Sequence, residues 1–116
     1  MNMCMDKFAT AGERRIARAI VRAALDSGFL LSVHDGEEIT VKKSGDRMEI
    51  LAALATTGED NLYFYEPTTG EAVTYYGRVY LVWGNDPTGC ELVADMGAPT
   101  DAGLAMLEAF IERATA

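Results

Sequence analysis

Residues 61–97 contain three segments in which apolar and polar side chains alternate, separated by turn sequences. The segments are Leu62–Glu66, Val73–Trp83 and Cys90–Met96, and the turns are residues 67–70 and 85–88. Alternation with a period of two is typical of half-buried β-strands, and short turns of this kind join antiparallel neighbours. The pattern predicts a three-stranded antiparallel meander, and the rest of the chain must fold around it.

Two further strands are predicted before the meander. Phe29, Leu31 and Val33 occupy alternate positions, and so do Ile39 and Val41. A hairpin loop over residues 35–37 would place Val33 opposite Ile39 and Leu31 opposite Val41. We favour this loop length because a shift of one residue would turn one strand's apolar side chains to the wrong face.

Three segments have the apolar spacing of amphipathic helices and begin at capping residues. The first begins after Thr10, with Glu13 completing a capping box, and Gly28 is placed to end it. The second begins after Asp46, and the third is predicted over Asp101–Arg113.

The predicted order is therefore α-β-β-α-β-β-β-α. It favours one α+β domain over residues 1–116, with residues 1–9 flexible. Most strand connections are hairpins, so we expect a mostly antiparallel five-stranded sheet with its helices packed mainly on one face.

The net charge of −8 is unevenly distributed. Residues 1–22 carry five basic and two acidic groups, and residues 23–116 carry five basic and 16 acidic groups, which gives +3 and −11. The strong negative charge of residues 23–116 disfavours direct binding of nucleic acid and favours a basic partner. Arg14, Arg18 and Arg22 form a stripe on the first helix. This stripe is either a contact for an anion or acidic protein, or a solvated face whose arginines pair with the acidic body.

Catalytic and metal-binding signatures are missing from the sequence. There is no glycine-rich phosphate loop, no serine-centred elbow and no metal-ligand spacing. His34 beside Asp35 has no second histidine or nucleophile to work with, so we interpret it as a surface residue. Cys90 is expected to be buried. We therefore expect a non-enzymatic protein without cofactor or metal. No apolar run reaches the length of a membrane span, and no secretory signal precedes Thr10, so we expect a cytoplasmic protein.

The side chains of the meander can be sorted by parity onto two faces of the sheet. Pairing Phe64 with Val73 and Trp83 with Cys90 collects apolar residues on a core face, where Gly77 leaves room for a helix or marks a bulge. The outer face then carries tyrosines and an ion pair between Arg78 and Asp95. Tyrosine is enriched at binding hot spots because it joins a large contact area to a polar tip. The predicted partner-binding residues are Tyr63, Tyr65, Tyr76, Arg78, Tyr80, Glu37, Glu38, Glu91 and Asp95.

Residues 32–44 (SVHDGEEITVKKS), followed by residues 48–51 (MEIL), resemble small acidic proteins of bacterial phages and other mobile elements. The resemblance covers about residues 13–97. It implies an accessory protein that binds a host protein, and some such proteins mimic nucleic acid and block host nucleases.

Three functional hypotheses follow. The first is a protein-binding accessory protein that uses the tyrosines, the carboxylates or both. The second is a small-ligand or nucleotide-binding domain with a pocket near His34, Tyr76 and Arg78. The third is a self-associating protein whose tyrosine surface forms a homodimer interface.

Overall fold

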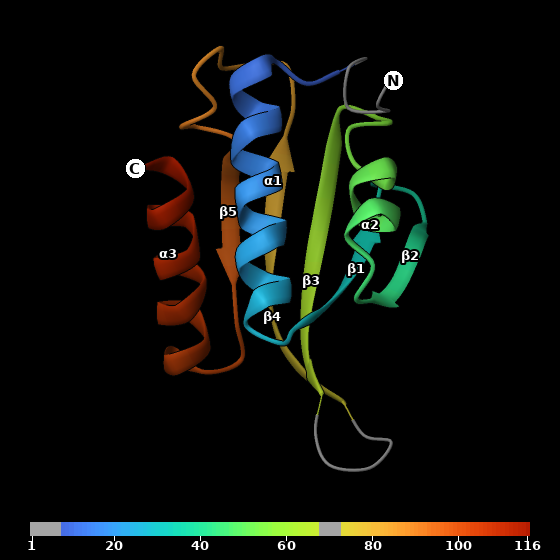
Figure 1. Cartoon of the computed structure of the whole chain (residues 1–116), viewed down its shortest axis with the longest axis vertical. Helices are drawn as coiled ribbons and strands as arrows, with labels where there is room; N and C mark the ends of the chain where they lie inside the picture. The colour runs from blue at the N-terminus through green and yellow to red at the C-terminus, as the bar shows by residue number, and fades with distance from the viewer. Residues whose placement is uncertain (1–7, 68–72) are drawn as a thin grey trace.

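The computed structural model describes residues 8–67 and 73–116, and the order of its elements is the predicted one (Figure 1). Most of the segment expected to be flexible, residues 1–9, lies outside the described residues. The elements are α1 (Ala11–Asp26), β1 (Leu30–His34), β2 (Ile39–Ser44), α2 (Arg47–Ala53), β3 (Glu59–Pro67), β4 (Val73–Val82), β5 (Val93–Gly97) and α3 (Asp101–Thr115).

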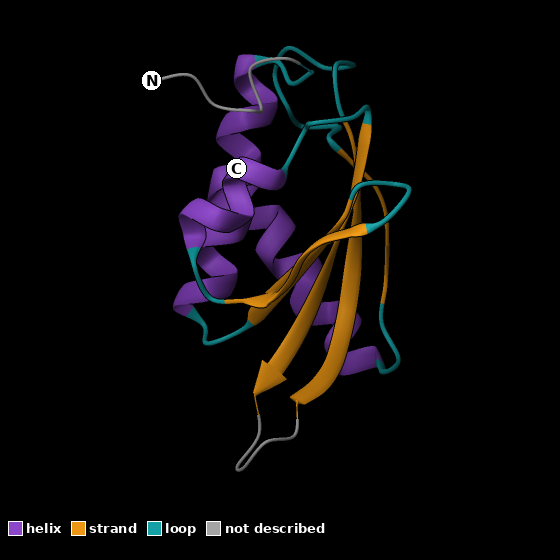
Figure 2. Cartoon of the chain, turned by 90° about the vertical axis from the view of Figure 1, so that its right-hand side faces the viewer, coloured by secondary structure: helices purple, strands orange, loops and turns teal. Residues whose placement is uncertain are grey.

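The five strands form one sheet in the order β2-β1-β3-β4-β5, and every neighbouring pair is antiparallel. All three helices lie on one face of this sheet, and α1 packs against both α2 and α3 (Figure 2). The predicted α+β class and the one-sided arrangement of helices are confirmed. Within the described part of the chain, no helix is long and apolar enough to cross a membrane.

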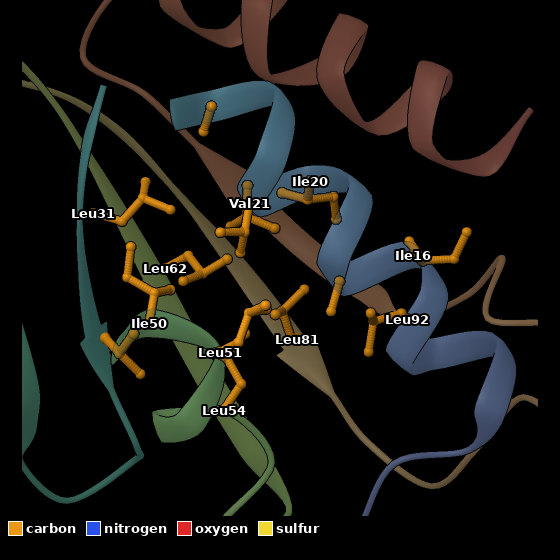
Figure 3. Packing of buried hydrophobic residues seen from close by; sticks show 14 of the residues in the cluster. Ile16, Ile20, Val21, Leu31, Ile50, Leu51, Leu54, Leu62, Leu81 and Leu92 are labelled. Atoms are coloured by element: carbon orange, nitrogen blue, oxygen red, sulfur yellow. The ribbon is translucent and has the colours of Figure 1, made fainter. Parts of the chain in front are cut away.

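The core fills the layer between the helices and the sheet (Figure 3). Ile16, Ile20 and Val21 of α1 and Leu62 and Leu81 of the central strands belong to this core, and all five side chains are fully buried. Burial of such a side chain contributes about 1.5–3 kcal/mol. Shorter α2 adds a second buried group, which consists of Ile50, Leu51 and Leu54.

The register of the first hairpin differs from the prediction. His34, not Val33, lies opposite Ile39, and Val33 lies opposite Val41. Asp35 causes the difference, because its carboxylate accepts two backbone N–H groups of the loop at 2.9 Å and closes a turn over residues 35–38. Ile39 is consequently 52% exposed, and its predicted place in the core is wrong.

The predicted strand Cys90–Met96 is too long at its beginning, since β5 starts at Val93. The side chain of Asp86 accepts the backbone N–H groups of Thr88 and Glu91, both at 2.9 Å, and bends residues 84–92 into a loop. Cys90 is exposed in this loop, so the prediction that it is buried is also wrong.

Glu13 joins this loop to the beginning of α1. Its fully buried carboxylate accepts four backbone N–H groups, from Thr10 at 2.9 Å and from residues 84, 85 and 86 at 2.7, 3.0 and 3.0 Å. Thr10 completes the predicted capping box and donates its hydroxyl to the carbonyl of Asp86 at 2.7 Å. Burial by itself would raise the pKa of Glu13, but the four N–H groups outweigh it and lower the pKa.

We expect Glu13→Gln to lower the free energy of unfolding by about 2–4 kcal/mol, because the amide would turn its own donors toward buried N–H groups. Urea denaturation at neutral pH measures this loss, and Glu91→Gln, at an exposed position of the same loop, is the matched control. Since folding lowers the pKa of Glu13, its stabilising effect is present above the pKa of an unfolded glutamate and is lost as the pH falls through the folded value. Equal stability of the two variants would contradict this role of Glu13.

Candidate functional site

The outer face of the sheet carries a group of tyrosines that no helix of the described chain covers (Figure 2). The ring of Tyr75 on β4 lies 6.3 Å from that of Tyr63 and 5.8 Å from that of Tyr65, both on β3. Tyr80 lies farther along β4 on the same face, because it alternates with the buried Val79 and Leu81. We call these four residues the tyrosine face.

Tyr76 does not belong to this face, which corrects the prediction. A β-bulge shifts the register between Phe64 and Tyr65, so that Tyr65 pairs with Tyr75 and one extra residue is accommodated on β4. Tyr76 therefore points toward the helices, where its ring lies 5.0 Å from that of Phe29. Gly77 beside it fulfils both roles proposed for it, since it lies at the bulge and a Cβ there would meet Leu107 of α3.

We expect Tyr76→Ala to lower the free energy of unfolding by about 2–3 kcal/mol, because it removes a ring that packs on the core. Tyr75→Ala, at the neighbouring position on the opposite face, should change it by less than about 1 kcal/mol. Chemical denaturation of both variants tests the bulge. A larger loss of stability for Tyr75→Ala than for Tyr76→Ala would mean that Tyr76 lies on the outer face, as the sequence predicted.

Three polar contacts fix the surroundings of the tyrosine face. Arg78 forms the predicted ion pair with Asp95, at 3.1 Å, and the ammonium group of Lys43 lies 5.1 Å from the centre of the Tyr65 ring. Both members of the ion pair are solvent-accessible, so it contributes under about 1 kcal/mol. The hydroxyl of Tyr80 donates to Glu59 at 3.0 Å, and this hydrogen bond raises the pKa of the phenol.

The predicted carboxylates lie in three places, of which the first is the position of Asp95 in the ion pair with Arg78. Glu37 and Glu38 are exposed in the loop between β1 and β2, and Thr57 links this loop to β3 by donating to the carbonyls of Asp35 and Glu59, both at 2.8 Å. We call Asp35, Glu37, Glu38 and Glu59 the acidic rim; it adjoins the tyrosine face through Tyr80. Glu91 instead belongs to the loop of residues 84–92 that packs on the beginning of α1.

The residues of the predicted ligand pocket do not converge. Tyr76 faces the helices, whereas Arg78 contacts Asp95 on the outer face. His34 accepts a hydrogen bond from the backbone N–H of Gly36 at 3.1 Å and so helps to form its own turn. Among residues 8–67 and 73–116, no three His, Cys, Asp or Glu side chains are placed to hold a metal ion.

Asp60 is a buried acid that sequence reasoning missed. Its Oδ2 accepts the backbone N–H of Ala55 at 2.7 Å and the indole N–H of Trp83 at 2.8 Å, while its buried Oδ1 has no hydrogen-bond partner among the described residues. Burial raises the pKa of Asp60 to about 6, although the two hydrogen bonds act in the opposite direction, and the charges of Asp35 and Glu59 raise it further. The sequence contained a signal for its burial, because Asp60 is two residues from Leu62 on β3 and therefore lies on the same, core-facing side of the sheet.

We expect Asp60→Asn to remove a pH dependence of stability. A folded pKa of about 6, against 3.8, means that the folded state binds more protons in this interval, so the contribution of Asp60 to stability falls as the pH rises through it. The shift corresponds to about 3 kcal/mol. Denaturation at several pH values from about 4 to about 7 should show that the free energy of unfolding of Asp60→Asn increases relative to that of the wild type, by this order of magnitude. A constant difference between the two proteins would contradict it.

The arginine stripe of α1 is divided between two surroundings. Arg14 donates to the carbonyl of Ala9 at 2.9 Å at the beginning of the helix. Arg18 and Arg22 line a half-open groove of about 610 Å³ on the side of the helices away from the sheet. Arg15, Arg47 and Arg113, which the sequence did not single out, also line it.

Comparison with protein-family models, with curated protein sequences and with solved structures gives no match for this chain.

Proposed function

We propose that this protein is a non-enzymatic binding protein that docks a partner protein on the outer face of its sheet. The observation that carries the proposal is the tyrosine face, where the ring of Tyr75 lies beside those of Tyr63 and Tyr65 on a sheet surface that no helix of the described chain covers. Tyr75 is 39% exposed, although an isolated domain gains nothing from displaying a large aromatic side chain. Tyrosine supplies contact area at a low entropic cost, which is the property of a binding hot spot.

Charge supports a partner with a basic patch. The acidic rim adjoins the tyrosine face at one end of the sheet, and the chain as a whole carries a charge of −8. A basic patch on the partner would be attracted to the rim and would orient the partner on the tyrosines. A second copy of this chain would present the same rim and be repelled there.

The phage-related resemblance gives the proposal a narrower form, in which the partner is a host nucleic-acid-binding protein. The site that binds phosphate on such a protein is basic, and it would accept the acidic rim in place of nucleic acid. In this form the tyrosines contribute most of the affinity, and the carboxylates take the place of the phosphate groups of nucleic acid.

We expect a specific protein to be retained from a nuclease-treated bacterial lysate and to depend on the tyrosine face. Once the retained protein is purified, Tyr63→Ser combined with Tyr75→Ser should weaken binding by at least about tenfold, as for hot-spot residues. Glu37→Lys combined with Glu38→Lys should mainly slow association and reduce its salt dependence. Met48→Ser removes an exposed apolar side chain from α2, on the opposite side, and is the matched control.

Three outcomes would overturn the proposal as stated. Unchanged affinity of the double tyrosine variant would exclude the tyrosine face. Binding that is lost only in the double glutamate variant would assign the function to the acidic rim alone. A concentration-dependent dimer in sedimentation, abolished by the tyrosine changes, would make the partner a second copy of the chain.

A further inference from the structure

The groove between the helices carries the opposite charge to the chain as a whole. Among residues 8–67 and 73–116, five of the nine basic residues line the groove described above, whereas Asp26 is the one acidic residue of 16 that does so. The groove thus carries a local charge of +4, and the remainder of the chain carries −12. The five basic residues come from all three helices and are Arg15, Arg18, Arg22, Arg47 and Arg113.

Tertiary structure, not sequence proximity, brings these arginines together. Arg15, Arg18 and Arg22 follow one another along the exposed side of α1 over about 10 Å. The opposite side of the same helix is buried on the sheet through Ile16, Ile20 and Val21 (Figure 3). Neighbouring α2 and α3 flank α1 and contribute Arg47 and Arg113 to the groove (Figure 1).

The arginines of the groove are not neutralised within the described chain. All five arginines are exposed. The ion pair found between described residues joins Arg78 to Asp95 on the outer face of the sheet and so does not involve the groove. Arg113 contacts the ring of Phe110, with its guanidinium 5.8 Å from the ring centre. Like charges spaced three and four residues apart on a helix destabilise it, so an unpaired cluster in a chain rich in carboxylates indicates an external anion.

The size and lining of the groove restrict that anion. A volume of about 610 Å³ falls within the range of small-molecule sites. Apart from the arginines, the lining consists of Ala19, Ala23, Asp26 and Ser27, without an aromatic ring to stack on a base or a large apolar side chain to anchor a peptide. Guanidinium groups bind phosphate through paired hydrogen bonds. A long nucleic acid would meet the acidic remainder of the surface, whereas a compact anion would experience only the groove.

We propose that the groove between α1, α2 and α3 is a binding site for a compact polyphosphate anion, such as inorganic triphosphate or the phosphate chain of a nucleotide. The arginines bind the phosphate groups, and the groove makes no selection for a base. The site is on the other side of the molecule from the tyrosine face and is independent of the proposed partner.

Titration calorimetry of the whole chain with inorganic triphosphate, at an ionic strength of about 0.15 M, tests the site. We expect saturable binding, a rise in melting temperature, and a similar affinity for a nucleoside triphosphate, because only phosphate is recognised. Arg18→Gln combined with Arg22→Gln should weaken binding by more than about tenfold, and Arg18→Lys should restore only part of the loss relative to Arg18→Gln.

Lys42→Gln is the control for Arg18→Gln, since it removes one positive charge from an exposed position on β2 and should leave binding unchanged. Much tighter binding of the nucleoside triphosphate than of triphosphate would mean that the base is read elsewhere and would overturn a phosphate-only site. The proposal also fails if triphosphate does not bind, if Lys42→Gln weakens it as much as Arg18→Gln, or if the arginine changes instead dissociate an oligomer. None of these outcomes depends on the tyrosine face, so the two proposals can fail separately.

Discussion

The carboxylate of Glu13 is the contact on which the arrangement of the two halves of the chain depends. It accepts N–H groups from the beginning of α1 and from residues 84–86, which are about seventy positions away in the sequence. The contact requires a very close approach, since a Cβ on Gly12 would collide with the backbone of residues 87 and 88. A buried charge is tolerated here because four backbone N–H groups donate hydrogen bonds to it.

This contact holds the beginning of α1 against the loop of residues 84–92. With α1 held at one end, its apolar side packs on the sheet and its arginines face outward between α2 and α3. The outer face of the sheet is left to the tyrosines and the acidic rim. Two surfaces of opposite charge on one small domain permit two different ligands to bind without competing for the same residues.

The pKa values of the two buried carboxylates, Glu13 and Asp60, are shifted in opposite directions. Glu13 has four N–H donors and a lowered pKa, whereas Asp60 has two donors, an unpartnered oxygen and two acidic neighbours, and its pKa rises to about 6. The number of hydrogen bonds donated to each group decides whether burial favours its charged or its neutral form. Asp60 lies beneath the acidic rim, so its protonation changes the charge of that end of the sheet.

The sequence by itself determined the element order, the antiparallel class and the caps at Thr10 and Glu13, because these follow from local periodicity and capping. It also predicted most of the outer face, including the contact between Arg78 and Asp95. It did not determine that Tyr75 lies on the outer face and Tyr76 on the core face, since a β-bulge changes which residues of a strand share a face without a signal in the composition. Only the tertiary structure gathered the five arginines and gave Glu13 its distant partners, because both depend on how the helices pack rather than on spacing along the chain.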